Sequence, residues 1–99
     1  MLFRSARVNA DTLRLVLEDW RLENSTYRIG GDADYDPETK AELGWVPDGD
    51  KNLYSYAVVG ATTNNYSVEI TYIPTGIWLR CENRMNRCCD GTGAVEACP

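Results

Sequence analysis

Histidine is absent from the 99 residues of this chain, and several motifs of catalytic sites are absent with it. Without an imidazole, a Ser-His or Cys-His nucleophile and a histidine metal ligand are excluded. The sequence also has no glycine-rich phosphate loop after a strand and no Cys-x-x-Cys pair. We therefore expect a protein that is not an enzyme and that needs neither a cofactor nor a metal ion.

Long apolar runs are scarce as well. No stretch approaches the roughly 18 apolar residues of a membrane-spanning helix. The N-terminal part, residues 1–20, contains no apolar run of signal-peptide length. Cysteine is missing from residues 1–80, and all four cysteines lie in the last fifth of the chain, at Cys81, Cys88, Cys89 and Cys98.

The cysteine spacing favours disulfides. A bridge between the neighbours Cys88 and Cys89 would be strained, which leaves two pairings open. One joins Cys81 to Cys88 and Cys89 to Cys98; the other joins Cys81 to Cys89 and Cys88 to Cys98. A four-thiolate zinc site is the rival interpretation, but the spacing lacks the two Cys-x-x-Cys-like pairs of such sites. Disulfides indicate an oxidising location outside the cytosol.

An exported protein needs an export signal, and the start of this sequence offers none. The residues Leu2–Ser5 match the translation of the end of a common sequencing adapter. We therefore expect residues 1–5 to be a read artefact and the natural sequence to begin near Ala6, with an upstream part missing.

Size and charge restrict the partners. A chain of this length forms one domain with a thin core. It has 15 acidic and 10 basic residues, a net charge of −5, which disfavours nucleic acid as a partner. Arg80, Arg84 and Arg87 are a local exception, and we regard them as a candidate basic interaction surface.

The first predicted element is an amphipathic helix over residues 5–24. Apolar residues recur every three or four positions and form one face: Ala6, Ala10, Leu13, Leu17 and Trp20. Val16 widens this face, and Asn24-Ser25-Thr26 ends the helix. Leu15 and Leu22 fall outside the main stripe, which suggests a second contact surface.

Residues 27–52 are predicted to form an acidic loop. Asp36-Pro37-Glu38 resembles a helix start, so we expect one helical turn that continues to about Leu43. The alternating Asp32, Asp34 and Asp36 invite a calcium interpretation. An EF-hand is excluded because its glycine and glutamate positions hold Pro37 and Leu43. A looser calcium site and a plain solvated loop remain as alternatives.

From residue 53 the hydrophobic period changes to two, and residues 53–81 predict three strands of an antiparallel meander. In the middle strand, Tyr66, Val68, Ile70 and Tyr72 share one face, which should pack on the helix. Residues 82–99 form a tail with few apolar side chains, which the disulfides would hold. The predicted fold class is α+β: an N-terminal amphipathic helix on a small antiparallel meander, with a disulfide-bound C-terminal loop.

This order of elements resembles the globular head of a type IV pilin or pilin-like protein. The stretch Ala6–Tyr27 is similar to the C-terminal half of the pilin spine helix, which runs into an Asn-x-Thr-Tyr-like exit. The stretch LGWVPDGDKNLYSYAV, residues 43–58, resembles the passage from the family's variable loop into its first strand. The cysteine-closed end resembles the family's C-terminal disulfide region.

The resemblance implies a structural subunit of an extracellular filament that serves adhesion, motility or DNA uptake. Its partners would be other pilin subunits and the inner-membrane assembly machinery, reached through a missing apolar helix. The subunit would be stored in the inner membrane and then displayed at the cell surface. The loop around Asp32, Asp34 and Asp36 would face neighbours or solvent.

Three alternatives stay open. A pseudopilin of a type II secretion system has the same architecture. A minor pilin that binds DNA would use Arg80, Arg84 and Arg87. The third alternative is an unrelated secreted, disulfide-stapled binding module, which an ordinary cleavable signal peptide in the complete gene would favour.

Overall fold

A computed structural model describes the backbone of residues 4–49, 52–82 and 87–90, and the side chains of residues 6–49 and 52–82. Its elements are the helix α1 (Arg4–Asn24), the 3-10 helix η1 (Pro37–Thr39) and the strands β1 (Tyr54–Val59), β2 (Ser67–Tyr72), β3 (Ile77–Glu82) and β4 (Arg87–Asp90). Within these residues, no helix combines the length and the apolar character needed to cross a membrane.

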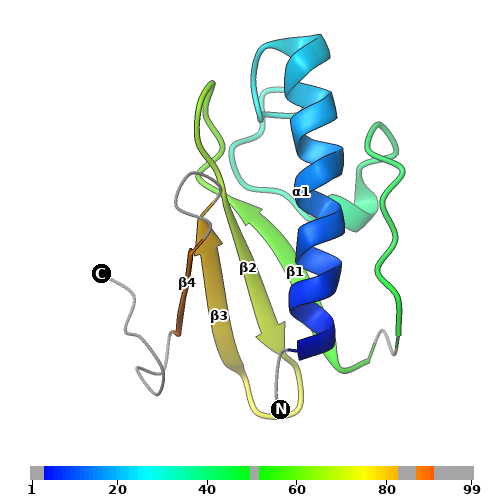
Figure 1. Ribbon diagram of the computed structural model, residues 1–99, viewed down its shortest axis with the longest axis vertical. Coiled ribbons are helices and arrows are strands. Elements are labelled where there is room, and N and C mark those ends of the chain that lie inside the picture. Colours follow the sequence, from blue (N-terminus) through cyan, green and yellow to red (C-terminus); the bar gives the residue numbers. More distant parts are fainter. Residues whose placement is uncertain (1–3, 50–51, 83–86, 91–99) are drawn as a thin grey trace.

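The strands form one antiparallel sheet in the order β1-β2-β3-β4, and α1 lies against one of its faces (Figure 1). The register places Ile70 of β2 between Tyr56 of β1 and Leu79 of β3. Short connections permit such a meander because antiparallel neighbours need only a turn between them. The α+β class, the helix and the three predicted strands are therefore confirmed.

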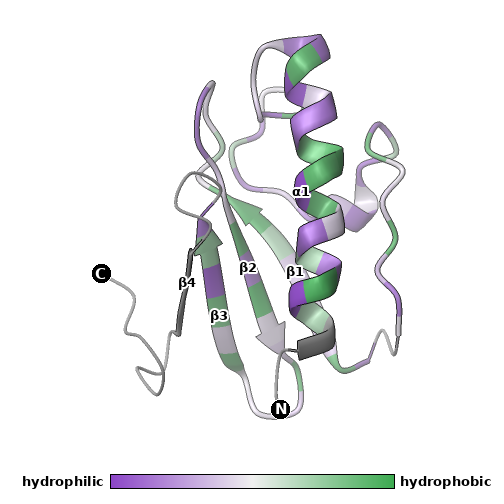
Figure 2. Cartoon of the chain, in the orientation of Figure 1, coloured by the Kyte–Doolittle hydropathy of each residue, from purple (hydrophilic) through white to green (hydrophobic). Residues whose placement is uncertain are grey.

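The core lies between α1 and the sheet. The predicted helix face is buried, with Ala6, Leu13 and Leu17 fully enclosed and Trp20 half-buried. From the sheet, Val58, Val68, Ile70 and Leu79 meet this face. Figure 2 shows apolar colour on the helix and on the strands that it covers. The period-two prediction for β2 is confirmed, because Val68 and Ile70 are buried while Ser67, Glu69 and Thr71 are half-exposed.

The C-terminal part differs from the prediction. A fourth strand, β4, pairs with β3 inside residues 82–99, where the sequence predicted only a disulfide-held tail. The short sequence Arg-Cys-Cys-Asp has no alternation of its own, so the pairing depends on the neighbouring strand rather than on a local pattern. Each predicted disulfide involves at least one cysteine whose side chain lies outside the described residues.

The predicted helical turn is shorter than expected. Asp36 accepts a hydrogen bond from the Glu38 backbone N–H, and Pro37 occupies the first position, as the pattern indicated. The element, however, is a 3-10 helix of three residues that ends at Thr39, with Lys40 as its C-cap. Such short runs are typical of 3-10 helices because their hydrogen-bond geometry is poorer.

Candidate functional site: the exposed face of the helix

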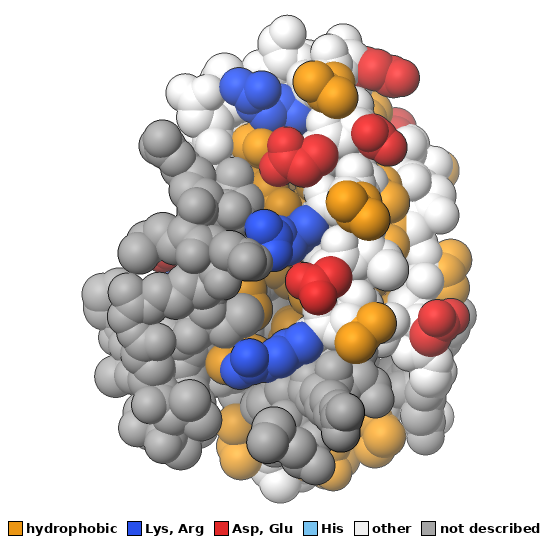
Figure 3. Space-filling model, in the orientation of Figure 1, with side chains coloured by type: hydrophobic (Ala, Val, Ile, Leu, Met, Phe, Trp, Pro, Cys, Tyr) orange, Lys and Arg blue, Asp and Glu red, His pale blue; other side chains and the backbone are white. Residues whose placement is uncertain are grey.

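Helix α1 is apolar on two opposite sides. Opposite the buried face, a second row of apolar residues points away from the sheet. Val8, Leu15 and Leu22 are 61%, 69% and 78% exposed. They are spaced by seven residues, which returns a helix to within about 20° of the same direction. Figure 3 shows hydrophobic side chains in a row down the exposed side of α1. We call these three residues the outer row.

Charged residues flank the outer row. Arg7, Arg14 and Arg21 repeat with the same spacing of seven and form a basic row along one side. Two of them have described contacts. Arg14 lies 3.7 Å from an oxygen of Asp11. Arg21 donates hydrogen bonds to the turn after β1, at Thr63 O (2.9 Å) and an Asn64 side-chain oxygen. The exposed face of α1 therefore has an apolar centre with a row of arginines along one side.

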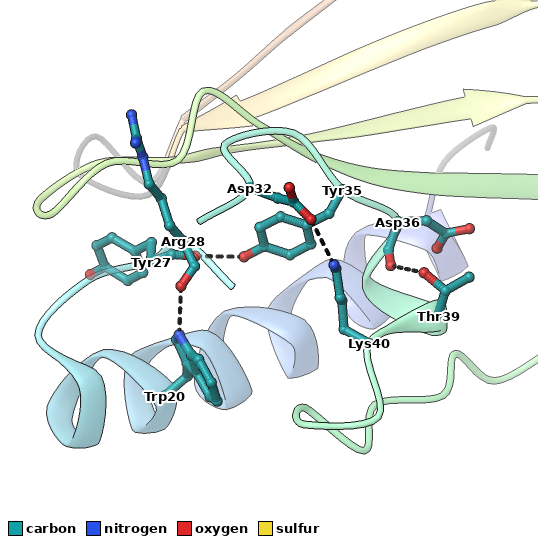
Figure 4. A network of polar contacts seen from close by, with 8 residues as sticks. All are labelled: Trp20, Tyr27, Arg28, Asp32, Tyr35, Asp36, Thr39 and Lys40. Atoms are coloured by element: carbon teal, nitrogen blue, oxygen red, sulfur yellow. Dashed lines mark hydrogen bonds and ion pairs between the residues drawn. The ribbon is translucent and has the colours of Figure 1, made fainter. Parts of the chain in front are cut away.

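A groove of about 190 Å³ lies beside the outer row, on the side away from the basic row. Its walls come from α1 and from the segment after η1, and its lining consists of Val16, Asp19, Trp20, Glu23, Glu42 and Leu43. Half of this lining is apolar and half is acidic. The Trp20 indole is held in place because its Nε1 donates a hydrogen bond to Arg28 O at 3.0 Å (Figure 4). The groove is therefore lined by a fixed aromatic side chain and by three carboxylates, which we call its acidic rim.

Buried polar contacts hold the second wall of the groove against α1. Asn9 is only 5% exposed and donates hydrogen bonds from Nδ2 to Asp48 O and to the Tyr56 hydroxyl, both at 2.9 Å. Its Oδ1 accepts the Asp48 backbone N–H at 3.0 Å. Nearby, Trp45 Nε1 donates to the Thr12 hydroxyl at 3.0 Å. Sequence reasoning missed Asn9, since the only local signal is its position at the border of the apolar stripe.

The three aspartates of the calcium interpretation have separate roles. Asp32 pairs with Lys40 at 2.9 Å, as Figure 4 shows. Asp34 accepts the Gly60 backbone N–H at 2.8 Å, and Asp36 caps η1. The loop thus uses these carboxylates to hold its own shape. Across residues 6–49 and 52–82, no group of three His, Cys, Asp or Glu side chains is arranged to hold a metal ion.

The predicted basic surface is described only at Arg80. Its guanidinium pairs with Glu69 at 2.9 Å on the neighbouring strand and lies over the Trp78 ring at 5.3 Å. Arg84 lies outside the described residues, and only the backbone of Arg87 is described. Because the side chains of Arg84 and Arg87 are not described and Arg80 is paired with Glu69, a joint role of the three arginines stays a prediction.

Burial shifts the titration of three tyrosines. It raises the pKa of Tyr35, whose hydroxyl donates to Tyr27 O at 2.7 Å (Figure 4), and it raises the pKa of Tyr66. Burial also raises the pKa of Tyr56, although the hydrogen bond from Asn9 acts to lower it. All three belong to the core between helix and sheet. Their shifted pKa values therefore reflect packing rather than a catalytic cleft.

Comparison with known proteins identifies no relative: no family model, no curated protein and no solved structure matches this chain.

Proposed function

We propose that this chain is the globular head of a type IV pilin-like subunit, and that it coats an extracellular filament. The order helix, loop and antiparallel meander supports this proposal. In such a filament, α1 connects the head to an apolar helix upstream that lies in the filament core and, before assembly, in the inner membrane. The function is mechanical, with no catalysis and no cofactor.

The observation that carries the proposal is the outer row of α1. A surface helix that serves only its own domain has one apolar stripe, whereas α1 has a second on the opposite side. Burying a leucine or valine of this kind contributes about 1.5–3 kcal/mol. Packing of Val8, Leu15 and Leu22 against neighbouring subunits would therefore stabilise a filament, while leaving them in water stabilises nothing.

The first test is the coding sequence upstream of Ala6 in the source DNA. We expect a short basic leader followed by about 20 apolar residues, the length of a spanning helix. An ordinary cleavable signal peptide would favour a secreted binding module instead, and a true start at Met1 would also contradict the filament. A pseudopilin would show the same leader but would be encoded among genes of a secretion system.

The second test changes the outer row in the full-length subunit in its host. We expect Leu15→Glu with Leu22→Glu to reduce sheared surface filaments at least tenfold, because charges would have to be buried between subunits. The fold should persist, since both side chains are exposed. Val46→Glu, an exposed apolar position off the helix, is the matched control and should leave filaments intact. Normal filaments from the double variant would contradict the proposal.

The tail is part of this proposal. We propose that Cys81 pairs with Cys88 and Cys89 with Cys98. The strand register supports this, because Cys81 of β3 is directly opposite Cys88 of β4, while Cys89 is opposite Arg80. Directly opposed residues of antiparallel strands have Cα separations within the disulfide range. Each bridge would contribute on the order of 2–4 kcal/mol and hold the tail against β3.

Paired serine variants test the connectivity. In C81S/C88S the remaining cysteines are true partners, so we expect no thiol to react with Ellman's reagent after denaturation. In the matched variant C81S/C89S the remaining cysteines come from different bridges, so both thiols should react. The reverse pattern would establish the alternative pairing. Reactive thiols throughout the oxidised wild-type chain would contradict any disulfide.

A further inference from the structure

The acidic rim of the groove has no cation to balance it in the described part of the chain. No side-chain hydrogen bond or ion pair joins the carboxylates of Asp19, Glu23 or Glu42 to another described residue. Three carboxylates thus line the same groove as the half-buried Trp20 ring and the apolar side chains of Val16 and Leu43. A guanidinium fits this combination, because it pairs with carboxylates and stacks on an aromatic face. The groove is therefore complementary to an arginine side chain.

Arg7 is the matching cation on the same chain. Among the basic side chains that the structure describes, the others already make contacts. Arg14 lies near Asp11, Arg21 and Arg28 donate to backbone carbonyls, Lys40 pairs with Asp32 and Arg80 pairs with Glu69. Arg7 is exposed, and no such contact is present for it within the described residues. It also lies on the opposite side of the outer row from the groove, so its own groove is out of reach.

Because the outer row and the basic row of α1 both repeat every seven residues, two parallel copies can bring their outer rows together and place Arg7 beside the groove at the same time. A shift of two heptads, about 21 Å along the helix axis, brings Arg7 of one copy level with residues 19–23 of the other. The same shift brings Val8 of the first copy level with Leu22 of the second. The apolar rows and the charges therefore come into register at one stagger, because both repeat every seven residues.

We propose that a second copy of this chain docks against the exposed face of α1, with its Arg7 in the groove of Asp19, Glu23 and Glu42. The contact joins two different surfaces of the same chain, so each copy leaves one surface free for the next. Such head-to-tail contacts build open helical arrays rather than closed dimers. The inference deepens the proposed filament function and rests on it, since it names a contact between neighbouring heads.

Charge-reversal variants test the contact. Their association is measured by sedimentation equilibrium at chain concentrations up to about 1 mM, a range that detects weak association. We expect concentration-dependent association of the wild type that weakens with added salt. Arg7→Glu alone, or Glu23→Arg with Glu42→Arg, should weaken it about tenfold, since like charges then meet. Combining the three substitutions should restore it. Glu38→Arg, an exposed acid outside the groove, is the control and should have no effect.

Cross-linking locates the contact. In Arg7→Lys, a zero-length carbodiimide should join residue 7 of one copy to Asp19, Glu23 or Glu42 of another, as a mixture of isotope-labelled and unlabelled chains would show. A monomeric wild type, association that survives the reversals, or cross-links that exclude the groove would each overturn the proposal. A basic leader upstream without this cross-link would keep the filament and remove this contact. The cross-link without a leader would do the opposite.

Discussion

Replacing Leu17 with alanine should lower the free energy of unfolding by about 3–5 kcal/mol, because the substitution leaves a cavity in a closely packed core. Leu17 is fully buried on the inner face of α1, between the helix and the sheet. A domain of this size has only about 5–10 kcal/mol of stability. The variant should therefore lie close to unfolding at body temperature.

Leu15→Ala is the matched control for this prediction. The same chemical change, two residues away in the same helix, removes a side chain that is 69% exposed. Its effect on stability should be within about 0.5 kcal/mol, as for other surface substitutions. Urea denaturation followed by circular dichroism measures both variants. Equal losses of stability at the two positions would show that α1 does not pack on the sheet through the face that contains Leu17.

Alkaline pH should destabilise the folded protein. Burial raises the pKa of Tyr35 and of Tyr66 above the ordinary value of 10.0. A raised pKa means that the folded state prefers the neutral phenol. The stabilising contribution is therefore fully present below pH 10 and is lost as the pH rises from there towards the native pKa. Each pH unit in that window costs about 1.4 kcal/mol for each of the two tyrosines.

Stability measured by urea denaturation at pH 8, 10 and 11, with brief exposure to alkali, tests this prediction. The tyrosinate absorbance of Tyr35 and Tyr66 should not rise while the protein is folded. It should rise when the circular dichroism signal of the folded state disappears. Tyr35→Phe should reduce the loss of stability above pH 10, because one of the buried groups with a raised pKa no longer titrates. At neutral pH it should cost about 1 kcal/mol for the lost hydrogen bond to Tyr27 O. Stability that stays constant between pH 8 and 11 would contradict the burial of both hydroxyls.

The groove illustrates a feature that sequence reasoning could not find. Trp20 and Leu43 are 23 positions apart in the sequence, and no local pattern relates them. Trp20 and Leu43 line the same groove because Asn9 binds Asp48 and Thr12 binds Trp45. These bonds hold the segment that follows Leu43 against α1. These contacts join residues 33 and 39 positions apart. Their partners are set by the path of the whole loop.

The aspartates show what the sequence left open. Their alternation allowed either a loose calcium site or a plain solvated loop, and spacing alone does not distinguish the two. In the folded loop, Asp32 meets Lys40, Asp34 meets the turn after β1 and Asp36 caps η1. Each carboxylate therefore has its own partner in the fold, and these partners lie 2 to 26 positions away in the sequence.

Local sequence patterns were enough to predict the helix, its buried face and the three meander strands. Each of these depends on a hydrophobic period within a few positions, so local chemistry suffices. The pairing of β4 with β3, the burial of Asn9 and the acidic groove beside Trp20 became visible only in the folded chain. Those features depend on strand pairing and on polar partners far apart in the chain, which become neighbours only when the chain folds.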